Sequence, residues 1–594
     1  SLWSNTAPIR EELFGLERLE EHATSLAKAQ QVVDPAPAVL SLQTRLNKNS
    51  VALLVAYRES AAELKAGRTV VPAAEWLLDN YHLVEEQIRE VRDDLPAGYY
   101  RQLPKLAEGP FAGYPRVFGM VWAYVAHTDS HFDPHVLVRF INAYQKTQPL
   151  TIGELWAVAI TLRIVLIENL RRLTDQITRG RAKRLDADQL VEKLLVPGRE
   201  YSALQEDIAS RSPGPLSEIF AAQLVKRLRD QDPNTTPALE WLEKRLQAQD
   251  LTVEEVVQRT QQRQGASNVT IRNVMTSMRL ISDIDWSDLF EKVSLVDQQL
   301  GENSVFAGMD FPTRNLYRSA IEQLARGSHL SEVDIAQRAV HIAQLPHLGH
   351  GAIDQVQLNR LSDPGYYLID QGRRQLEESI DYTPPLGLRI RRFHVKLGVG
   401  GYCGTLAVVA LVYLALALLF PSVSDLSVQW WLLWTLVGFI PATDVAGTIV
   451  NRLVNWRFGA MTLPALELKS GVPTSLRTLI AVPTLLTSKT DLLAQIERLE
   501  VHFLSGIDGD VSFALLTDGV DAPEEELAGD GPLIALATAE IESLNLRYPA
   551  TPAGPRFLVL HRRRLFNPSE KVWMGWERKR GKLHELNQLL RGAT

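Results

Sequence analysis

Two long stretches without charged residues restrict the fold of this chain more than any other feature. They cover residues 397–423 and 426–443. A helix of about 20 predominantly apolar residues crosses the hydrocarbon core of a bilayer. We therefore predict a transmembrane hairpin over residues 391–456, with spans at about 397–420 and 428–450. A lipid bilayer is then a partner of the chain.

Basic residues flank the outer ends of both spans. They are Arg389, Arg391, Arg392 and Lys396 before the hairpin, and Arg452 and Arg457 after it. Since positively charged flanks stay in the cytoplasm, residues 1–390 and 457–594 are expected there, with the connector from Pro421 to Asp425 on the opposite side. A pair of buried helices in a soluble domain is the alternative. The tryptophans that open the second stretch suit a membrane interface and favour the hairpin.

Residues 1–390 show helical periodicity nearly throughout. The clearest helical stretches cover residues 9–31, 73–94, 150–176, 216–229 and 314–325. Thr151 and Glu154 have the spacing of a capping box that opens one long helix. Glu154 and Glu168 are the residue types of a glycosidase pair, but nothing in the sequence places them opposite each other. We interpret this region as a cytoplasmic α-helical domain that acts as a scaffold or binds partners.

Charge and cysteine content exclude several classes of function. The 594 residues carry a net charge of -7, with a pI near 6.1, so no general basic excess indicates a nucleic-acid partner. Cys403 is the only cysteine, which excludes an intramolecular disulfide and a cysteine-rich metal site. We predict no metal site and no signal peptide. The missing initiator Met at Ser1 and the abrupt end at Thr594 suggest a piece of a longer polypeptide.

Three short apolar runs alternate with amphipathic helical stretches near the end of the chain. The runs cover residues 479–484, 513–518 and 557–561. Strands that alternate with helices indicate parallel βαβ units, and the ligands of such sheets bind at the carboxyl ends of the strands. Residues 457–594 are therefore predicted to form part of a Rossmann-like α/β domain with the first half of a nucleotide-sugar site.

Polar residues at these strand ends supply the candidate binding groups. The carboxylate of Asp518 can accept hydrogen bonds from the uracil or ribose of a nucleotide, with Asp521 in reserve. The hydroxyl of Thr484 can add another hydrogen bond. Gly581 and Lys582 are expected in a turn that opens a helix, so that the lysine and the helix dipole approach a diphosphate.

Long strings across the chain resemble bacterial cyclic β-1,2-glucan synthases. Near the end of the chain they are VPTLLTSKTDLLAQIERLEVHFLS, FALLTDGVDAPEE and KVWMGWERKRGKLHELNQLLRG. Upstream they are PIREELFGLERLEEHA, EWLLDNYHLVEEQIREVRDDLPAGYYRQLPKL, GPFAGYPRVFGMVWAYVAHTDS, QPLTIGELWAVAITLRIVLIENLRRL and DPGYYLIDQGR. The strand end at Thr484, the acid at Asp518 and the Gly581-Lys582 pair followed by Asn587 also resemble the wider group of processive family-2-like transferases.

The resemblance implies a hexosyltransferase of the bacterial inner (cytoplasmic) membrane that uses UDP-glucose. Such an enzyme builds β-1,2-glucan on a protein-linked intermediate and then cyclises it. Its partners are the growing glucan and the remaining C-terminal domains of the full-length enzyme. The resemblance also implies Mg²⁺ or Mn²⁺ as cofactor, with the metal ligands and the catalytic base beyond residue 594. No catalytic residue is then expected within this chain, and this fragment alone is expected to be inactive.

The resulting fold class is a mainly α N-terminal region, a two-helix transmembrane hairpin, and a partial α/β GT-A glycosyltransferase domain truncated to its N-terminal half. Two other functions stay open. One is a noncatalytic membrane-anchored scaffold that recruits partners through the helical region, and the other is a synthase of another β-glucan. The basic runs at 561–564 and 578–582 are compatible with an anionic-lipid or nucleic-acid patch, but charge runs are usually solvated, and we predict no nucleic-acid partner.

A protein-linked intermediate needs an acceptor hydroxyl on the polypeptide. Tyr548 is the only tyrosine after the predicted hairpin, and the Pro/Gly-rich residues 549–555 follow it. Such a segment is expected to be an exposed loop that is mobile enough to enter an active site. A phenol also loses its proton more readily than a serine hydroxyl. Tyr548 is therefore a candidate priming residue, and an aromatic side chain that closes a helix is the alternative.

Overall fold

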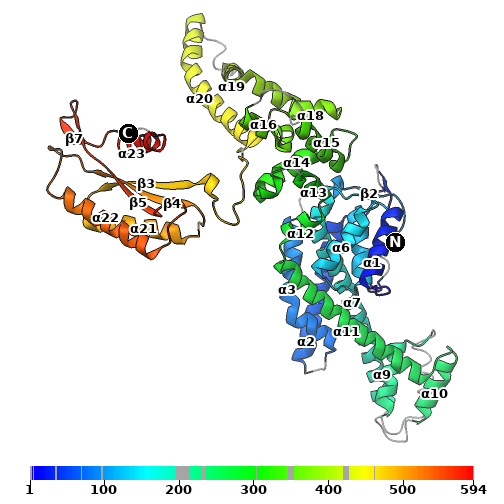
Figure 1. The fold of residues 1–594 in the computed structure, drawn as a ribbon. Helices are drawn as coiled ribbons and strands as arrows, with labels where there is room; N and C mark the ends of the chain where they lie inside the picture. The colour runs from blue at the N-terminus through cyan, green and yellow to red at the C-terminus, as the bar shows by residue number, and fades with distance from the viewer. Residues whose placement is uncertain are drawn as a thin grey trace. The chain divides into compact units, whose positions relative to one another are not determined.

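In the computed structural model, the chain divides into two compact units (Figure 1). One unit contains Ser1–Ser304 and Leu316–Gly447, and the other contains Val305–Asn315 and Thr448–Thr594. The residues that the structure describes are 3, 6–33, 37–67, 70–94, 98–194, 215–229, 236–302, 304–345, 354–418, 427–460, 462–506 and 508–592.

The first unit is mainly α-helical, as the sequence predicts. Its long helices before residue 304 are α2 (Leu42–Lys65), α3 (Pro72–Asp94), α7 (Ile152–Leu194) and α11 (Val253–Asp283). The shorter elements there are α1 (Leu16–Ala29), β1 (Val32–Val33), α4 (Tyr99–Gln102), β2 (Lys105–Leu106), α5 (Arg116–His127), α6 (Pro134–Gln145), α9 (Glu218–Arg229), α10 (Thr236–Gln247), α12 (Trp286–Val293) and α13 (Leu295–Gly301). Next come α14 (Phe311–Arg326), whose first five residues belong to the second unit, α15 (Glu332–Gln344), α16 (Gln355–Leu361), α17 (Pro364–Leu368) and α18 (Arg373–Ser379).

Thr151 and Glu154 form the predicted capping box at the start of α7. The backbone N–H of Glu154 donates to Thr151 Oγ1 at 3.2 Å, and the N–H of Thr151 donates to Glu154 Oε2 at 2.9 Å. The Glu154 side chain is buried and also pairs with Arg116 Nη2 at 2.6 Å. The box satisfies two N–H groups that a helix start otherwise leaves without partners. This explains why the 43-residue helix begins at Ile152.

Glu168, the other acid of the glycosidase-like pair, is buried among basic side chains. Arg45 Nε and Asn49 Nδ2 each donate to Glu168 Oε2 at 2.8 Å, and Arg172 Nε donates to Glu168 Oε1 at 2.8 Å. Burial alone raises the pKa of Glu168, but the hydrogen bonds from Arg45 and Arg172 and the charge of Arg171 lower it to about 2. The carboxylate therefore joins α2 to α7 and has a structural role.

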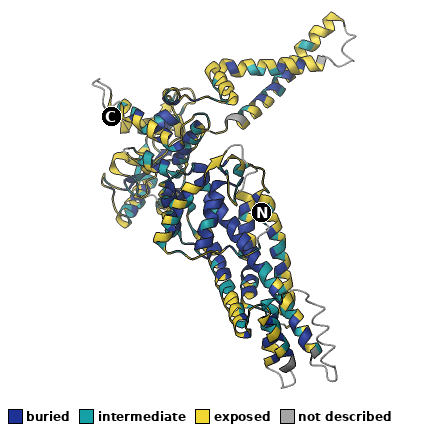
Figure 2. Cartoon of the chain, turned by 90° about the vertical axis from the view of Figure 1, so that its right-hand side faces the viewer, coloured by how far each residue is buried: buried dark blue, intermediate teal, exposed yellow. Residues whose placement is uncertain are grey.

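The predicted spans lie in helices α19 (Leu386–Leu418) and α20 (Val428–Phe458). Both helices are long and apolar enough to cross a membrane, and 17% of the most apolar window of each is buried. Figure 2 shows the exposed colour along much of both helices. Contiguous exposed apolar surface marks protein or membrane contact sites, so this pattern supports a membrane location. The predicted connector at 421–425 lies outside the described residues.

Small residues form the contact between α19 and α20. Ala410 and Leu414 of α19 and Ala442 and Ala446 of α20 make one buried cluster. A Cβ built at Gly438 would lie 3.1 Å from Leu414 Cδ1, so the two helices approach closely there. Small residues at such contacts are typical of transmembrane helix pairs, where packing replaces the hydrophobic effect as the driving force.

The second unit contains a three-stranded parallel sheet with the strand order β3-β4-β5. Its elements are η5 (Thr474–Leu476), β3 (Thr478–Leu486), α21 (Lys489–Leu504), β4 (Val511–Gly519), α22 (Asp530–Arg547), β5 (Phe557–Arg562), β6 (Leu565–Asn567), β7 (Val572–Met574) and α23 (Arg578–Leu590). The three predicted apolar runs are therefore strands, and helices connect them. The antiparallel pair β6–β7 is an addition that the sequence did not predict.

The sheet and its two crossover helices enclose the core of the second unit. Figure 1 shows α21 and α22 along one face of the sheet and α23 on the opposite side. Phe513 and Phe557 from the strands pack with Leu492, Ile541 and Leu544 from these two helices. The central strand β4 is buried along nearly its whole length, which is typical of a parallel strand. This packing fixes the carboxyl ends of the three strands at one edge.

Residues 305–315, which contain η2 (Phe306–Gly308) and the start of α14, also belong to the second unit. Met309 pairs with Leu466 in an isolated antiparallel bridge, and the N–H of Asp310 donates to the carbonyl of Ala465 at 3.0 Å. The hydroxyl of Thr313 accepts from the N–H of Ala465 at 2.9 Å. These bonds explain why residues 305–315 group with the sheet and not with their sequence neighbours.

Candidate functional site

The carboxyl ends of the three parallel strands bring the strongest candidate residues together. In the strand registers, Asp518 of β4 lies beside Leu485 of β3 on one side and Arg562 of β5 on the other. Asp518 is 1% exposed, so its carboxylate is enclosed by its neighbours. Because a buried carboxylate is costly without charged or hydrogen-bonding partners, those neighbours determine what the site can do.

Arg562 forms a two-pronged ion pair with Asp518. Its Nε donates to Asp518 Oδ1 and its Nη2 donates to Asp518 Oδ2, both at 2.9 Å. Its Nη1 donates to Glu585 Oε1 of α23 at 3.0 Å. Burial alone lowers the pKa of Arg562, but the bonds to Asp518 and Glu585 raise it above its ordinary value. The guanidinium therefore fixes the orientation of the Asp518 carboxylate and joins it to α23.

Lys582 approaches the same carboxylate from α23. Its Nζ lies 3.3 Å from Asp518 Oδ2 and donates to the backbone carbonyl of Thr484 at 2.6 Å. The lysine is 6% exposed. Burial lowers the pKa of Lys582, while the charge of Asp518 acts in the opposite direction. The structure thus brings Asp518, Lys582 and the backbone carbonyl of Thr484 together, whereas the sequence analysis assigned the Thr484 hydroxyl to the site.

The predicted turn at Gly581 and Lys582 is wrong. Both residues lie inside α23, which begins at Arg578, so Lys582 does not lie at a helix opening. Gly581 serves a different purpose, because a Cβ there would lie 1.9 Å from the Trp576 carbonyl oxygen and 2.6 Å from Arg562 Nη1. A glycine is required because the chain before α23 and the Arg562 side chain approach it closely.

The other two predicted binding residues occupy different positions. Thr484 lies two residues before the end of β3 at Leu486, so it is near the carboxyl end of the strand but not its last residue. Asp521 follows β4 and pairs with Arg578 Nη2 at 2.7 Å. The Asp521 side chain is 31% exposed, compared with 1% for Asp518. Asp521 therefore lies at the rim of the cluster and Asp518 at its centre.

Sequence reasoning missed two further polar contacts at this edge. Thr517 Oγ1 lies 2.9 Å from His561 Nδ1, and burial lowers the pKa of His561. Arg564 Nε donates to the carbonyl of Val520 at 2.5 Å, and its guanidinium also pairs with Asp530 at the start of α22. The second contact orders the chain that follows Asp518. The basic run at residues 561–564 was the only sequence signal for these contacts, but the partners of His561 and Arg564 depend on the strand register.

The described residues do not fit the divalent cation that the resemblance implies. Within them, no group of three or more His, Cys, Asp or Glu side chains is arranged to hold a metal ion. Asp518, the most enclosed acid of the site, already lies between two cations, with Arg562 at 2.9 Å and Lys582 at 3.3 Å. Both would repel a divalent cation at this carboxylate. No chemical step is therefore assigned to a metal at these residues.

Tyr548 is anchored at the end of the sheet opposite to Asp518. Its hydroxyl donates to Glu500 Oε1 at 2.7 Å, and its ring contacts Phe503 with centroids 4.8 Å apart. This hydrogen bond raises the pKa of Tyr548. The ring also packs near Phe557, the first residue of β5, whereas Arg562 is the last. At about 3.3 Å per residue, roughly 17 Å of strand separates these two ends.

The residues after Tyr548 form a closed turn. Most of residues 549–555 are exposed, as predicted, but Thr551 is buried and its N–H donates to the Gly554 carbonyl at 2.9 Å. Arg556 Nε donates to the Pro549 carbonyl at 3.0 Å. These bonds order the segment, so movement of Tyr548 toward the strand ends would require breaking them.

Comparison with known proteins supports the resemblance seen in the sequence. No protein-family model matches the chain. The chain is 36% identical over 587 residues to a cyclic beta-(1,2)-glucan synthase, NdvB, of Rhizobium meliloti (strain 1021), and the alignment covers 98% of the chain. The predicted resemblance is thereby confirmed. The chain spans 20% of the length of this synthase.

Proposed function

We propose that this chain is part of a membrane glucosyltransferase that builds β-1,2-glucan from UDP-glucose. The observation that carries the proposal is the 36% identity to a cyclic beta-(1,2)-glucan synthase along 98% of the chain. The charged cluster at the carboxyl ends of β3, β4 and β5 adds independent support, because ligands of open parallel sheets bind at that edge. We further propose that the sheet is the first part of a GT-A domain.

In this proposal, Asp518 binds the nucleoside and Lys582 binds the diphosphate of the donor. Arg562 orients the Asp518 carboxylate, so that its oxygens can accept hydrogen bonds from the uracil or ribose with little reorganisation of the site. Lys582 exchanges its contact with Asp518 for a phosphate oxygen, which stabilises the charge that develops on the leaving UDP. Burial lowers the pKa of Lys582, and a phosphate anion beside the ammonium would favour its charged form.

The remaining parts of the reaction are assigned to the longer enzyme. Sugar transfer requires a base that accepts the proton of the acceptor hydroxyl. We place neither this base nor the ligands of Mg²⁺ or Mn²⁺ among the described residues. The growing glucan, the lipid bilayer and the other domains of the longer protein are the proposed partners. The proposed location is the bacterial inner membrane, with residues 1–390 and 457–594 in the cytoplasm.

The protein-linked intermediate is a separate proposal, with Tyr548 as its candidate acceptor. In favour of this role, the phenol donates its hydrogen bond to Glu500 Oε1 at 2.7 Å. Glu500 can take this proton when the phenol oxygen attacks the anomeric carbon of UDP-glucose, as the bond from that carbon to the diphosphate breaks and UDP leaves. Against it stands the position of Tyr548 at the amino end of β5, away from Asp518. Priming at Tyr548 therefore requires movement of the segment or a donor bound to another copy.

Titration of UDP-glucose in the presence of Mg²⁺ tests the proposal. The titration is made on this chain and, in parallel, on the longer synthase that contains it, both in detergent micelles. We expect saturable binding by the longer enzyme, weaker binding by this chain, and a further weakening of both in Asp518→Ala. A noncatalytic scaffold predicts no binding in either protein. A synthase of another β-glucan predicts the same binding but a product whose linkage analysis shows no 1,2-linked glucose.

A further inference from the structure

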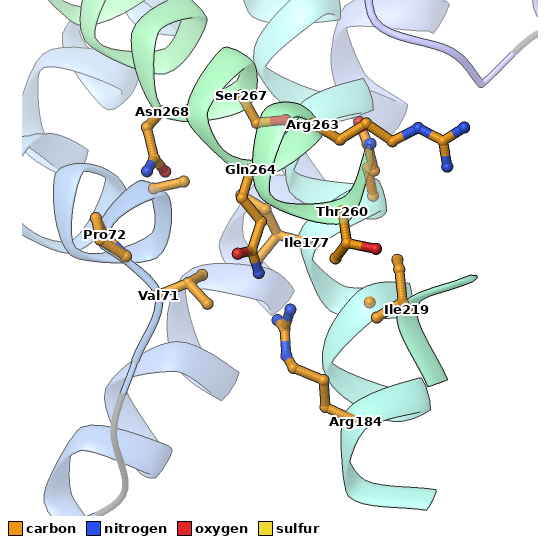
Figure 3. A pocket seen from close by; sticks show the side chains of 13 residues that line it. Val71, Pro72, Ile177, Arg184, Ile219, Thr260, Arg263, Gln264, Ser267 and Asn268 are labelled. Carbon is orange, nitrogen blue, oxygen red and sulfur yellow. The ribbon is translucent and has the colours of Figure 1, made fainter. Parts of the chain in front are cut away.

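A cavity of about 130 Å³ that is partly open to solvent lies in the first unit, among α3, α7, α9 and α11. It is formed entirely by residues of the helical region, so it is distinct from the cluster at the strand ends. One stripe of α7, from Gln176 to Arg184, faces a stripe of α11 from Thr260 to Asn268 (Figure 3). The side chain of Ile219 on α9 and the first residues of α3 close the remaining walls.

Arg184 is the only cationic side chain whose head group points into this cavity in Figure 3; Arg263 points away from it. A Cβ built at Gly180 would lie 3.9 Å from both Nη1 and Nη2 of Arg184, so the guanidinium folds back along its own helix over that glycine. Burial lowers the pKa of Arg184, and Asp188 one turn later raises it. An anion beside a half-buried guanidinium of this kind stabilises its charge through strong hydrogen bonds.

The nearby carboxylates are engaged by other basic residues. Asp188 lies 3.3 Å from Arg227 Nε and accepts from Gln223 Nε2 at 2.9 Å. Glu218 lies 2.7 Å from Arg263 Nη1. Among the residues that the structure describes, no carboxylate forms an ion pair with Arg184 within 4.0 Å. The guanidinium of Arg184 therefore has no direct ion-pair partner among the described side chains, and Asp188 acts on it only from beyond 4.0 Å.

Two buried oxygen atoms of the cavity wall also lack hydrogen-bond partners among the described residues. They are the amide oxygen Oε1 of Gln176 and the hydroxyl Oγ1 of Thr260. Most buried polar atoms in folded proteins have a partner, so such atoms indicate a bound molecule or ordered water. An amide oxygen accepts hydrogen bonds but cannot donate them, so the missing partner of Gln176 Oε1 is a donor.

The first turn of α3 adds a third favourable feature for an anion. Val71, Pro72 and Ala73 line the cavity, and Pro72 is the first helical residue. The N-terminus of a helix carries partial positive charge from its aligned peptide dipoles. It therefore favours an anion in the cavity, as the guanidinium of Arg184 does.

From this arrangement we propose that the cavity is a binding site for a small hydroxylated organic anion. Its anionic group, a carboxylate or a phosphate, pairs with Arg184, and a hydroxyl group donates to Gln176 Oε1. The apolar side chains of Ile177 and Ile219 contact its carbon atoms. A cavity of ~150 Å³ holds a molecule the size of benzene, so the ligand has roughly six or seven non-hydrogen atoms. A nucleotide sugar is too large for this site.

Because the site joins α3 and α7 to α9 and α11, a bound anion would hold these helices together. A ligand that binds the folded state alone raises thermal stability in proportion to the logarithm of its concentration above its Kd. The site therefore offers the helical region a way to respond to a small metabolite, independently of sugar transfer at the sheet.

The test uses the whole chain in detergent micelles at constant ionic strength, with calorimetric titration and thermal unfolding as readouts. The probes are glycerate and inorganic phosphate, which separate a carboxylate from a phosphate group. Propionate, which lacks hydroxyl groups, and glycerol, which lacks a charge, are the comparison compounds. We expect saturable binding of glycerate or phosphate, weaker binding of propionate, and no binding of glycerol.

Two substitutions separate the roles of charge and hydroxyl. Arg184→Gln should weaken anion binding by about tenfold or more, because it removes the charged partner. Gln176→Leu should leave the fold intact, since it removes an unpaired buried oxygen, but should abolish the preference for glycerate over propionate. Arg179→Gln is the matched control, because Arg179 lies on the same helix outside the cavity and is 64% exposed. It should bind like the wild type.

Three results would overturn the proposal. The first is the absence of saturable binding of both glycerate and phosphate to the wild-type chain. The second is equal binding by wild type and Arg184→Gln, which would indicate anion binding elsewhere. The third is an equal loss in Arg179→Gln, which would indicate a general charge effect.

Discussion

The guanidinium of Arg562 holds both carboxylate oxygens of Asp518 at 2.9 Å across two neighbouring strands. The two residues are register partners at the carboxyl ends of β4 and β5. A bidentate pair of this geometry fixes direction as well as charge. The acid that the sequence assigns to nucleotide binding is therefore oriented by a residue that the sequence analysis considered only as part of the basic run at 561–564.

Asp518→Ala should weaken donor binding by the full-length enzyme about tenfold or more. Loss of a hydrogen bond that involves a charged group costs roughly 1.5–3 kcal/mol. Calorimetric titration with UDP measures the effect. Asp521→Ala is the matched control, because its carboxylate is more exposed and pairs with Arg578 at the rim. Normal affinity in Asp518→Ala together with a loss in Asp521→Ala would assign the nucleoside to Asp521.

Arg562→Gln tests whether the pair acts as one unit. If Arg562 works by orienting Asp518, the double variant Asp518→Ala/Arg562→Gln should bind UDP no more weakly than Asp518→Ala. Such non-additivity is the mark of residues that act through each other. Additive losses would show instead that Arg562 contacts the nucleotide directly.

Lys582→Ala should reduce the affinity for UDP far more than the affinity for uridine. Lys582 Nζ lies at the Thr484 carbonyl and the Asp518 carboxylate, where a diphosphate can replace the acid as its partner. Competitive titration with UDP and with uridine separates the two contributions, and turnover by the full-length enzyme should fall with the UDP affinity. Equal losses for both ligands would place Lys582 at the nucleoside instead.

Local patterns in the sequence predicted the elements of the fold well. The spacing of Thr151 and Glu154 located the start of α7, and the apolar runs located β3, β4 and β5. These features depend on residues close together in the chain, where capping and side-chain periodicity act. The length and charge pattern of the two apolar stretches likewise located α19 and α20.

Contacts between distant segments were the part that sequence reasoning could not supply. Asp518 and Arg562 lie 44 residues apart, and their pairing depends on the register of two strands. Gly581 was predicted in a turn, but it lies inside α23. A glycine is required there because the Trp576 carbonyl, which precedes the helix, approaches it closely. A glycine can adopt a turn and can also allow close approach of another backbone, and only the tertiary packing determines which of the two occurs.

Labelling of cysteines introduced at Ser422 and Ser488 tests the predicted membrane topology. In a chain whose natural Cys403 is replaced by alanine, we expect Ser422→Cys to react with an impermeant thiol reagent added outside the cell. Ser488→Cys, at the start of α21, should be protected until the membrane is opened, because the basic flanks predict that both outer regions lie in the cytoplasm. The reverse pattern would place the sheet outside the cytoplasm.

Glu332 should make the helical region less stable as the pH rises toward neutrality. Its Oε2 accepts from the N–H of Ile152 at 2.6 Å, and burial, with the nearby charges of Glu322 and Glu154, raises its pKa to about 7. The folded state therefore binds the proton more tightly than the unfolded state. The stability that this proton contributes is fully present below about pH 4.5 and is lost as the pH rises through about 7.

Glu332→Gln should flatten this dependence, because the amide oxygen still accepts from Ile152 but does not titrate. Thermal unfolding of the whole chain between about pH 5 and pH 8 measures the slope for each protein. Glu254→Gln, an exposed acid on α11, is the control and should keep the wild-type slope. A wild-type slope in Glu332→Gln would show that another group titrates.

Tyr548→Phe should abolish the covalent label that UDP-glucose leaves on the full-length enzyme, if Tyr548 is the priming residue. Phenylalanine keeps the ring contacts with Phe503 and Phe557 and removes only the hydroxyl that donates to Glu500. Radiolabel that survives denaturation measures the linkage. Tyr366→Phe in the helical region controls for loss of a tyrosine hydroxyl elsewhere.

Because Tyr548 and Asp518 lie at opposite ends of the sheet, mixing Tyr548→Phe copies with Lys582→Ala copies distinguishes priming within one copy from priming between two copies. Label on the Lys582→Ala copies would mean that one copy primes another, whereas normal labelling of Tyr548→Phe alone would exclude Tyr548 and direct the search to serine, threonine or a residue elsewhere in the longer enzyme.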